Sequence, residues 1–227
     1  MEIGEISVKS RVGRLSMLPL LAWLIAGCTH AIPLKGNLEP PPDTKRLPLA
    51  VGIYYSPDLK AYEHVGARGG DRWAFPLGPA STKLFDKVFP IAFESAPVVP
   101  NLPPLNPVGP QVAAVIEPRI EAFDFDLPFL KTGTYRAEIT YRFTLYSPQG
   151  ESLASWTVTG VGAKPGQVGF EFARWPGEAA DLAMQDAASK FLTGFRDVPE
   201  VRKWLRQVGA PGITWIPRWI LTTFGRG

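Results

Sequence analysis

The most regular hydrophobic pattern in the chain is an alternation over residues 135–146. Charged residues and threonine occupy the even positions as far as residue 144, between apolar or aromatic residues at the odd positions. Successive side chains of a β-strand point to opposite faces, so the pattern predicts a long strand with one buried and one solvated face. The face expected to be buried is formed by Tyr135, Ala137, Ile139, Tyr141, Phe143 and Leu145.

Neighbouring segments are expected to extend this strand into a sheet. Residues 111–125 alternate more weakly and contain Pro118. Because proline cannot donate a ladder hydrogen bond, it predicts an edge position or a bulge there. Residues 147–150 (Ser-Pro-Gln-Gly) predict a turn, and residues 151–161 predict the returning antiparallel strand. A further strand is expected at residues 49–55, where β-branched and aromatic residues gather.

Two segments carry apolar residues at three- and four-residue spacing, which predicts helices with one buried face. The first begins at Pro79, and Pro90 is expected to kink or divide it because its ring removes a backbone donor. The second begins near Glu178 and Asp181, whose charges favour a helix N-terminus. A shorter helix is expected from Pro199. The two main apolar faces are formed by Leu84, Phe85, Val88, Phe89, Ala92 and Phe93, and by Ala180, Met184, Ala187, Ala188, Phe191 and Phe195.

Glycine and proline mark the segments between these elements. Residues 58–78 contain four glycines and are expected to form a loop. Within it, residues 66–70 (Gly-Ala-Arg-Gly-Gly) could cradle a phosphate, but they lack the Gly-Lys-Ser/Thr ending of such loops, which favours an ordinary loop. Six prolines between residues 97 and 110 predict an extended segment, which either crosses one end of the sheet or binds an aromatic-lined partner.

The order β-α-β-β-β-α predicts an α+β fold. We expect a two-layer sandwich, in which two main helices cover one face of an about four-stranded mixed or antiparallel sheet. A single domain is expected over residues 49–208, followed by an aromatic C-terminal tail over residues 209–227. Residues 28–48 are proline-rich and predict a tether, which could reach roughly 60 Å at about 3.1 Å per residue.

The N-terminus shows a different pattern. Three basic residues (Lys9, Arg11 and Arg14) precede an apolar stretch of 12 residues from Leu15 to Ala26. This stretch is too short to span a bilayer, which takes about 20 residues, so an uncleaved membrane anchor is the weaker interpretation. The stretch ends in Leu24-Ile25-Ala26-Gly27-Cys28, and Cys28 is the single cysteine of the chain.

This motif resembles the lipobox of bacterial lipoproteins. The resemblance implies that residues 1–27 are a signal peptide and that the mature protein begins at Cys28. It also implies a diacylglycerol on the Cys28 thiol and an acyl chain on its amine. Thr29 stands where aspartate is the familiar signal for retention in the inner membrane, so the resemblance implies an outer-membrane location.

Composition excludes several classes of function. The net charge of the chain is +3, and removal of residues 1–27, with three basic and two acidic side chains, leaves +2. This balance does not favour a nucleic-acid partner. The two histidines, His30 and His64, lie far apart, and the only cysteine is expected to carry lipid, which disfavours zinc sites and a cysteine nucleophile. We therefore expect no metal and no cofactor.

Two groups of residues remain as candidate chemistry. Asp124 and Asp126 would share one face of a continuing strand and, with Glu121, could serve a membrane-tethered hydrolase, although solvated residues at a strand end are commoner. In the tail, Trp215 and Trp219 flank Arg218, a combination that interfaces favour. The tail either binds a partner or packs back on its own domain.

The lipobox, the proline tether and the order of elements together resemble the small envelope lipoproteins of Gram-negative bacteria. These include the lipopolysaccharide-assembly lipoproteins and the auxiliary lipoproteins of envelope transport systems, and the similar arrangement covers roughly residues 49–208. The resemblance implies no catalytic residues and a binding or assembly role. We therefore expect a non-enzymatic lipoprotein that faces the periplasm from the outer membrane and binds an envelope protein complex or a lipid.

Overall fold

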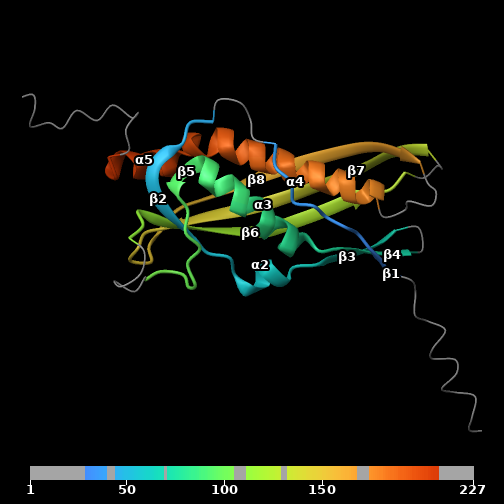
Figure 1. Cartoon of the computed structure of the whole chain (residues 1–227), viewed down its shortest axis with the longest axis horizontal. Coiled ribbons are helices and arrows are strands. Elements are labelled where there is room, and N and C mark those ends of the chain that lie inside the picture. The colour runs from blue at the N-terminus through green and yellow to red at the C-terminus, as the bar shows by residue number, and fades with distance from the viewer. Residues whose placement is uncertain are drawn as a thin grey trace, which may run out of the picture.

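The main sheet of the protein has five strands in the order β5-β2-β6-β7-β8 (Figure 1). The computed structural model describes residues 29–39, 44–68, 71–104, 111–128, 132–167 and 174–209. The neighbours β6, β7 and β8 are antiparallel, whereas β2 is parallel to both β5 and β6, so the sheet is mixed. Its strands are β2 (Leu47–Ile53), β5 (Phe93–Ser95), β6 (Ala114–Asp126), β7 (Thr132–Tyr146) and β8 (Ser152–Gln167).

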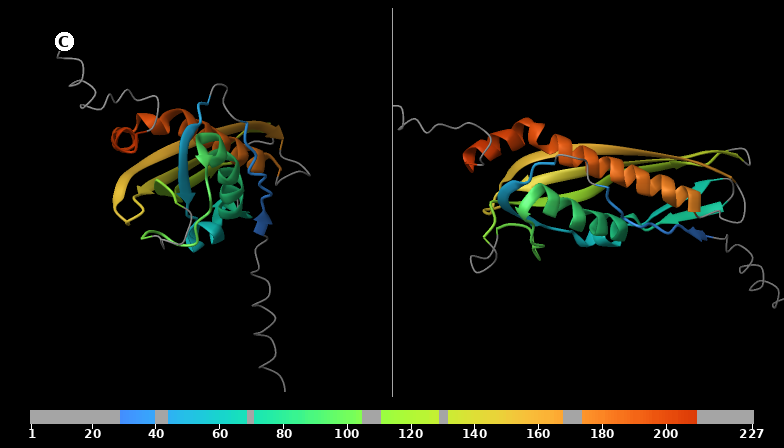
Figure 2. Two further views of the ribbon diagram at one scale, coloured as in Figure 1. Left: turned by 60° about the vertical axis from the view of Figure 1, so that its left-hand side comes forward. Right: turned by 45° about the horizontal axis from the view of Figure 1, so that its top comes forward.

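Two helices, α3 (Leu77–Ala92) and α4 (Arg174–Gly194), lie side by side over one face of this sheet (Figures 1 and 2). The last described elements are η2 (Phe195–Asp197) and α5 (Pro199–Gln207), and α5 buries Val201, Trp204 and Leu205. The predicted α+β sandwich is therefore confirmed, with one strand more than expected in the main sheet. The predicted order β-α-β-β-β-α corresponds to β2-α3-β6-β7-β8-α4.

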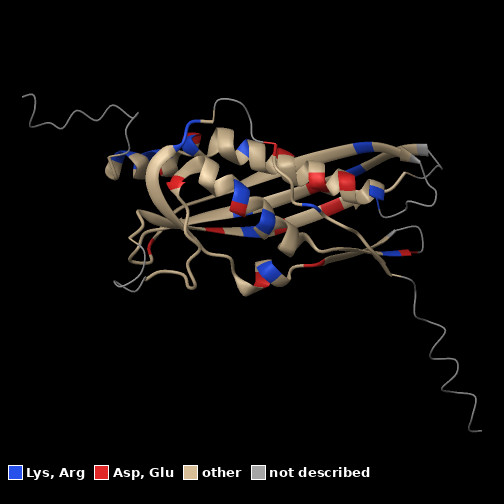
Figure 3. Cartoon of the chain, viewed as in Figure 1, with Lys and Arg blue, Asp and Glu red and all other residues tan. Residues whose placement is uncertain are grey.

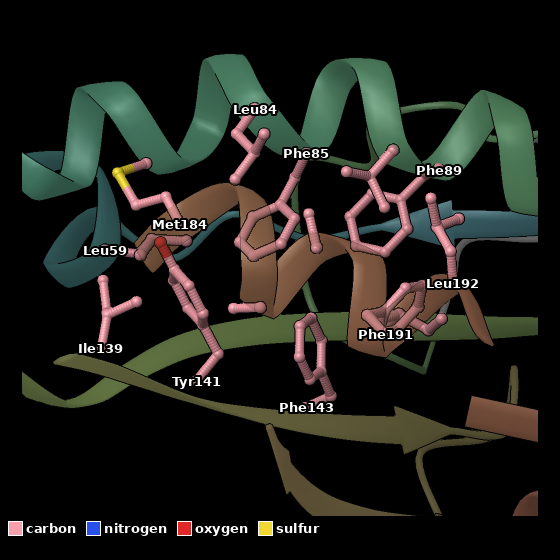
Figure 4. Close-up of a cluster of buried hydrophobic side chains, with 14 of the residues drawn as sticks. Leu59, Leu84, Phe85, Phe89, Ile139, Tyr141, Phe143, Met184, Phe191 and Leu192 are labelled. Carbon is pink, nitrogen blue, oxygen red and sulfur yellow. The ribbon is translucent and has the colours of Figure 1, made fainter. Parts of the chain in front are cut away.

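The core forms between α3, α4 and β7 (Figure 4). All six odd-numbered residues of β7 from Tyr135 to Leu145 are buried, so the alternation predicted for this strand is confirmed. The ring of Phe143 lies 5.6 Å from that of Phe85 on α3 and 4.7 Å from that of Phe191 on α4. The hydroxyl of Tyr141 shares a hydrogen bond of 2.7 Å with that of Ser81, which satisfies two polar groups inside the core.

A bulge divides β6 into two halves. The register with β7 shifts between Ile120 and Ala122, so Glu121 is an extra residue. After it the inward positions change parity, and Phe123 and Phe125 are buried while Ala122 is exposed. The alternation predicted for residues 111–125 is wrong on both sides of the bulge. Before it, residues 114–118 are all buried, including Glu117, which the alternation predicts to be exposed. Beyond it, one inserted residue turns the following side chains to the opposite face.

Residues 58–78 do not form the loop that their glycines predict. They contain parts of α2 (Pro57–Ala61) and α3, together with β3 (His64–Arg68) and β4 (Asp71–Phe75). With β1 (Thr29–Ala31), these two strands form a small sheet in the order β1-β4-β3. The phosphate-loop alternative is also wrong at residues 66–68, which lie in a strand. Gly66 packs so closely that a Cβ there would lie 2.6 Å from the ring of Phe125.

Both main helices differ from their predicted bounds. Pro90 lies in the last turn of α3 and does not divide it, since the helix continues to Ala92. Its ring removes one hydrogen bond of the last turn, and only two more residues follow in the helix. Helix α4 begins at Arg174, so Glu178 and Asp181 do not mark its first turn.

Helix α4 lies unusually close to β8. A Cβ on Gly160 would lie 2.0 Å from the carbonyl oxygen of Ala183, and a Cβ on Gly162 would lie equally close to that of Ala179. Ala179, Ala183 and Ala187 follow one another at four-residue spacing, so they line one face of the helix. Small residues on both elements therefore allow the backbones of α4 and β8 to touch.

The outer edge of β8 is also covered by α4. The carboxylate of Asp186 accepts a hydrogen bond of 2.8 Å from the N–H of Val161, and the Lys190 ammonium donates one of 2.9 Å to the carbonyl of Thr159. Asp186 and Lys190 form an ion pair of 2.7 Å with each other. The pair thus satisfies edge backbone groups that would otherwise be open to another strand.

We expect Gly160→Ala to destabilise the protein, because its methyl group would meet the backbone of α4 and not a flexible side chain. Overpacking of this kind costs about 1–3 kcal/mol, and each kcal/mol lowers Tm by roughly 2–4 °C in a domain of this size. Thermal unfolding followed by circular dichroism measures the change. Gly194→Ala is the matched control, because nothing lies within 4 Å of the added Cβ. Equal losses of Tm in both variants would contradict the close contact.

Candidate functional site

The residues predicted for lipidation and for partner binding lie outside the described residues. Cys28, the expected lipidation site, directly precedes the first described residue, Thr29. Trp215, Arg218 and Trp219 lie in the tail beyond residue 209. No helix among the described residues is long and apolar enough to cross a membrane. Lipidation and the interaction tail therefore stay predictions.

The candidate carboxylates of the hydrolase alternative all lie at exposed positions of β6. Glu121, at the bulge, forms an ion pair with Arg142. In the register with β7, Asp124 lies opposite Glu138 and Asp126 lies opposite Arg136. Within the described ranges, no three His, Cys, Asp or Glu side chains are grouped so that they could hold a metal ion.

Near Asp124, the side chain of His64 is held among aromatic rings. Its ring lies 5.0 Å from that of Phe123 and 6.1 Å from that of Phe125. Burial lowers the pKa of His64, and the negative charge of Asp124 opposes this shift. Burial thus favours the neutral form of the imidazole, and its ring packs between the two sheets.

A small pocket of about 200 Å³ lies beside the edge of β6. Strand β2 pairs with β6 only as far as Ile116, and α2 lies alongside the following residues. The cationic residue of this pocket is Arg119. Its guanidinium forms a 2.9 Å ion pair with the fully buried side chain of Glu117. Contact with the Glu117 carboxylate raises the pKa of Arg119. The pocket is lined by Ser56, Asp58, Leu59, Tyr62, Arg119 and Ile120.

The charges around this pocket already balance one another. Glu117 also accepts a 3.2 Å hydrogen bond from the Tyr146 hydroxyl, and Asp58 interacts electrostatically with Arg119. An anion that entered the pocket would meet two carboxylates near one guanidinium. The cluster is therefore better suited to hold the β6 edge and α2 together than to bind an anionic ligand.

The most distinctive arrangement lies at the N-terminal segment expected to be a tether. Strand β1 pairs in parallel with β4, and the N–H of Ile32 continues the pairing with a 2.9 Å hydrogen bond to the carbonyl of Ala74. Residues 32–39, which we call the strap, then run between α3 and α4 (Figures 1 and 2). Residues 44–48 are also described, and Leu47 begins β2. The prediction of a free tether is therefore wrong over the described parts of residues 28–48.

Alternate residues of the strap face the two helices. Ile32 and Gly36 are buried and Leu34 and Leu38 are half-buried, whereas the residues between them are exposed. Gly36 has φ = +57°, and a Cβ there would lie 2.5 Å from the carbonyl oxygen of Ala80 on α3. The backbone of the strap therefore touches α3 directly at a position that only glycine fits.

Asp181 on α4 holds the other side of the strap. Its carboxylate accepts hydrogen bonds from the N–H of Lys35 at 3.0 Å and the N–H of Gly36 at 3.2 Å. From α3, the Lys87 ammonium donates to the carbonyl of Gly36 at 3.1 Å. Burial raises the pKa of Asp181, and the two amides oppose that shift. The amides thus offset part of the free-energy cost of burying this carboxylate.

The two ends of the described chain lie at opposite ends of an elongated body (Figures 1 and 2). Thr29 begins β1 beside β3 and β4 at one end, and α5 lies at the other. The exposed side of α5 is basic, with Arg202, Lys203 and Arg206 (Figure 3). Both regions that carry the predicted site residues, before Thr29 and after α5, therefore join the body at different ends.

The strap could have been found from the sequence. Ile32, Leu34, Gly36 and Leu38 alternate with exposed residues, which is the period of an extended segment with one buried side. Its prolines and its position after the lipobox favoured a tether instead. No local pattern predicts the contact with Asp181, because Lys35 and Gly36 precede it by 146 and 145 positions in the chain.

The fold resembles that of a protein of known structure. The crystal structure of protein XCC0632 from Xanthomonas campestris, of the family model DUF330, matches with a TM-score of 0.50 and 12% sequence identity. The match covers 78% of this chain and 98% of that chain. At this identity the similarity concerns the fold alone. No family model matches the chain, and no curated protein matches its sequence.

We expect Asp181→Ala to release the strap, because it removes the acceptor of two backbone amides. Hydrogen bonds to a charged group are worth about 1.5–3 kcal/mol, so exchange at Lys35 and Gly36 should accelerate roughly 10- to 100-fold. Hydrogen–deuterium exchange with residue-level readout measures it.

Asp186→Ala is the control for this experiment, since it removes a carboxylate from the same helix that accepts from Val161. Its effect should appear at Val161 and leave Lys35 and Gly36 protected. Unchanged protection of these two amides in Asp181→Ala would show that the carboxylate does not hold the strap.

Proposed function

We propose that this protein is a lipoprotein of the outer membrane and acts in the periplasm as a non-catalytic binding or assembly subunit. The observation that carries the proposal is the lipobox Leu24-Ile25-Ala26-Gly27-Cys28 together with its position. Cleavage before Cys28 would remove none of the described residues, and the first of these, Thr29, already belongs to the folded body. The proposed cleavage site therefore lies one residue before the first described residue.

The attachment would come from acyl chains on Cys28. Each buried methylene contributes about 0.8 kcal/mol, and one acyl chain binds a membrane only reversibly. A diacylglycerol on the thiol and a third chain on the amine give stable attachment by the same reasoning. Thr29, in place of aspartate after the cysteine, supports the outer membrane over the inner one.

The non-catalytic part of the proposal is supported by the candidate carboxylates. Glu121 is occupied by Arg142, and neither Asp124 nor Asp126 lines the pocket beside β6. A hydrolase would need these groups to converge on a bound substrate. Their position on the exposed side of β6 is instead typical of solvated strand residues.

We expect Cys28→Ala to remain unprocessed or become soluble, because the thiol is the only attachment point for diacylglycerol. The test is expression in a Gram-negative host with a fatty-acid analogue, followed by detergent-phase partitioning. Wild-type protein should carry the label and enter the detergent phase, whereas the variant should do neither. A variant that incorporates as much label as wild type would refute the assignment.

The partner-binding element of the proposal is the tail, which begins after α5. Trp215 and Trp219 offer large apolar area, and Arg218 between them offers a directional charged contact. Helix α5 already buries Val201, Trp204 and Leu205, so the described core is closed before the tail begins. A partner in the envelope, either a protein complex or a lipid, would bind this element.

We expect truncation after Gly212 to abolish partner binding and change Tm by less than about 2 °C, since each kcal/mol of lost packing costs roughly 2–4 °C. Co-purification from detergent-solubilised envelopes measures binding, and circular dichroism measures Tm. The double variant Trp215→Ala with Trp219→Ala tests the rings in the full-length chain. A drop of several degrees with binding intact would instead make the tail part of the fold.

A further inference from the structure

The docked strap determines how far the body can stand from a lipid on Cys28. A free tether over residues 29–39 could extend by about 3.1 Å per residue. In the structure, these residues form β1 and the strap, and their backbone is hydrogen-bonded to Ala74, Asp181 and Lys87. No free length remains between residue 29 and the folded body.

We infer that the end of the body formed by β1, β4 and β3 lies against the membrane surface, with α5 pointing away from it. The inference rests on the proposed lipidation of Cys28. Consecutive Cα atoms are about 3.8 Å apart, so Thr29 lies one residue from the atoms that carry the acyl chains. Those chains enter the hydrocarbon, so β1 lies at the level of the lipid headgroups.

Strand β1 is firmly joined to its neighbours, so the position of Thr29 also places β4 and β3. Its three residues pair with Arg72, Trp73 and Ala74, and the ring of His30 lies 4.9 Å from that of Trp73. His30 also lies 3.6 Å from the carboxylate of Asp71. Strands are about 4.8 Å apart, so β3, two strands away, lies roughly 10 Å from β1.

The surface of this end fits contact with a membrane held by an anchor. Its described side chains include Asp71 and Arg72, which carry opposite charges and are both exposed. Val65 on β3 is an exposed apolar residue, 43% accessible. Together β3 and β4 carry two basic residues, Arg68 and Arg72, and one acidic residue, Asp71. This small excess of positive charge attracts anionic lipids only weakly, so the acyl chains supply the attachment and the short connection supplies the orientation.

The test uses the lipidated full-length chain in vesicles that contain a headgroup-labelled quencher lipid. Cys28 is the only native cysteine, and its thiol would carry lipid, so an introduced cysteine is the only one free to react with a fluorophore. Val65→Cys places the probe on β3, and Gln207→Cys places it at the exposed end of α5. We expect loss of fluorescence at position 65 and no loss at position 207.

A lengthened connection provides the matched control. Insertion of a threonine and about 11 Gly/Ser residues between Cys28 and Thr29 keeps threonine after the cysteine and adds a flexible linker of roughly 19 Å root-mean-square length. The inserted chain should still float with vesicles, but quenching at position 65 should fall.

Flotation separates the two levels of the proposal. Protein that floats but is quenched equally at both positions, or more at position 207, overturns the orientation and leaves the lipoprotein assignment intact. Quenching at position 65 that is unaffected by the insertion also overturns it, because the short connection would then not be the cause. Protein that carries no lipid and does not float overturns the proposed function and the orientation with it.

Discussion

The close contact between α4 and β8 is the constraint on which most of the structure depends. Gly160 and Gly162 allow the backbone of the helix to lie directly on the strand, where any larger residue would displace it. The position of α4 relative to α3 fixes the path of the N-terminal strap between them, where Asp181 and Lys87 hydrogen-bond to its backbone from the two helices. A shift of α4 would therefore alter the path of the chain at its N-terminus, far away in sequence.

The sequence predicted the parts of the fold whose hydrophobic period is uninterrupted. Strand β7 and the inward faces of α3 and α4 follow their patterns over many residues, and burial confirms them. The prediction failed where one residue changes the period, because Glu121 reverses the two faces of β6. It also failed where glycines serve packing between strands and not a turn, as Gly66 does against Phe125.

The candidate site also contains a part that the sequence could predict and a part that it could not. The resemblance to a lipobox rests on five adjacent residues, so it is visible in the sequence alone, and it remains the basis of the proposed function. The docking of residues 32–39 could not be recognised from composition, because proline content is shared by free tethers and by extended segments that lie on a surface. The decisive group is a carboxylate about 145 residues away, and sequence spacing carries no information about that contact.

The ion pair between Asp186 and Lys190 at the edge of β8 has a consequence for how neighbouring copies of the protein meet. An unprotected edge strand is a template for pairing with another chain. Proteins confined to the plane of a membrane meet one another far more often than the same number free in solution, and they meet side by side. Because Asp186 and Lys190 occupy the backbone groups of Thr159 and Val161, one copy is prevented from adding its strand to the next at this point. The same two side chains that join α4 to the sheet thus keep another copy from pairing with β8 at Thr159 and Val161, and under the proposed lipid anchor this protection would matter where copies meet side by side.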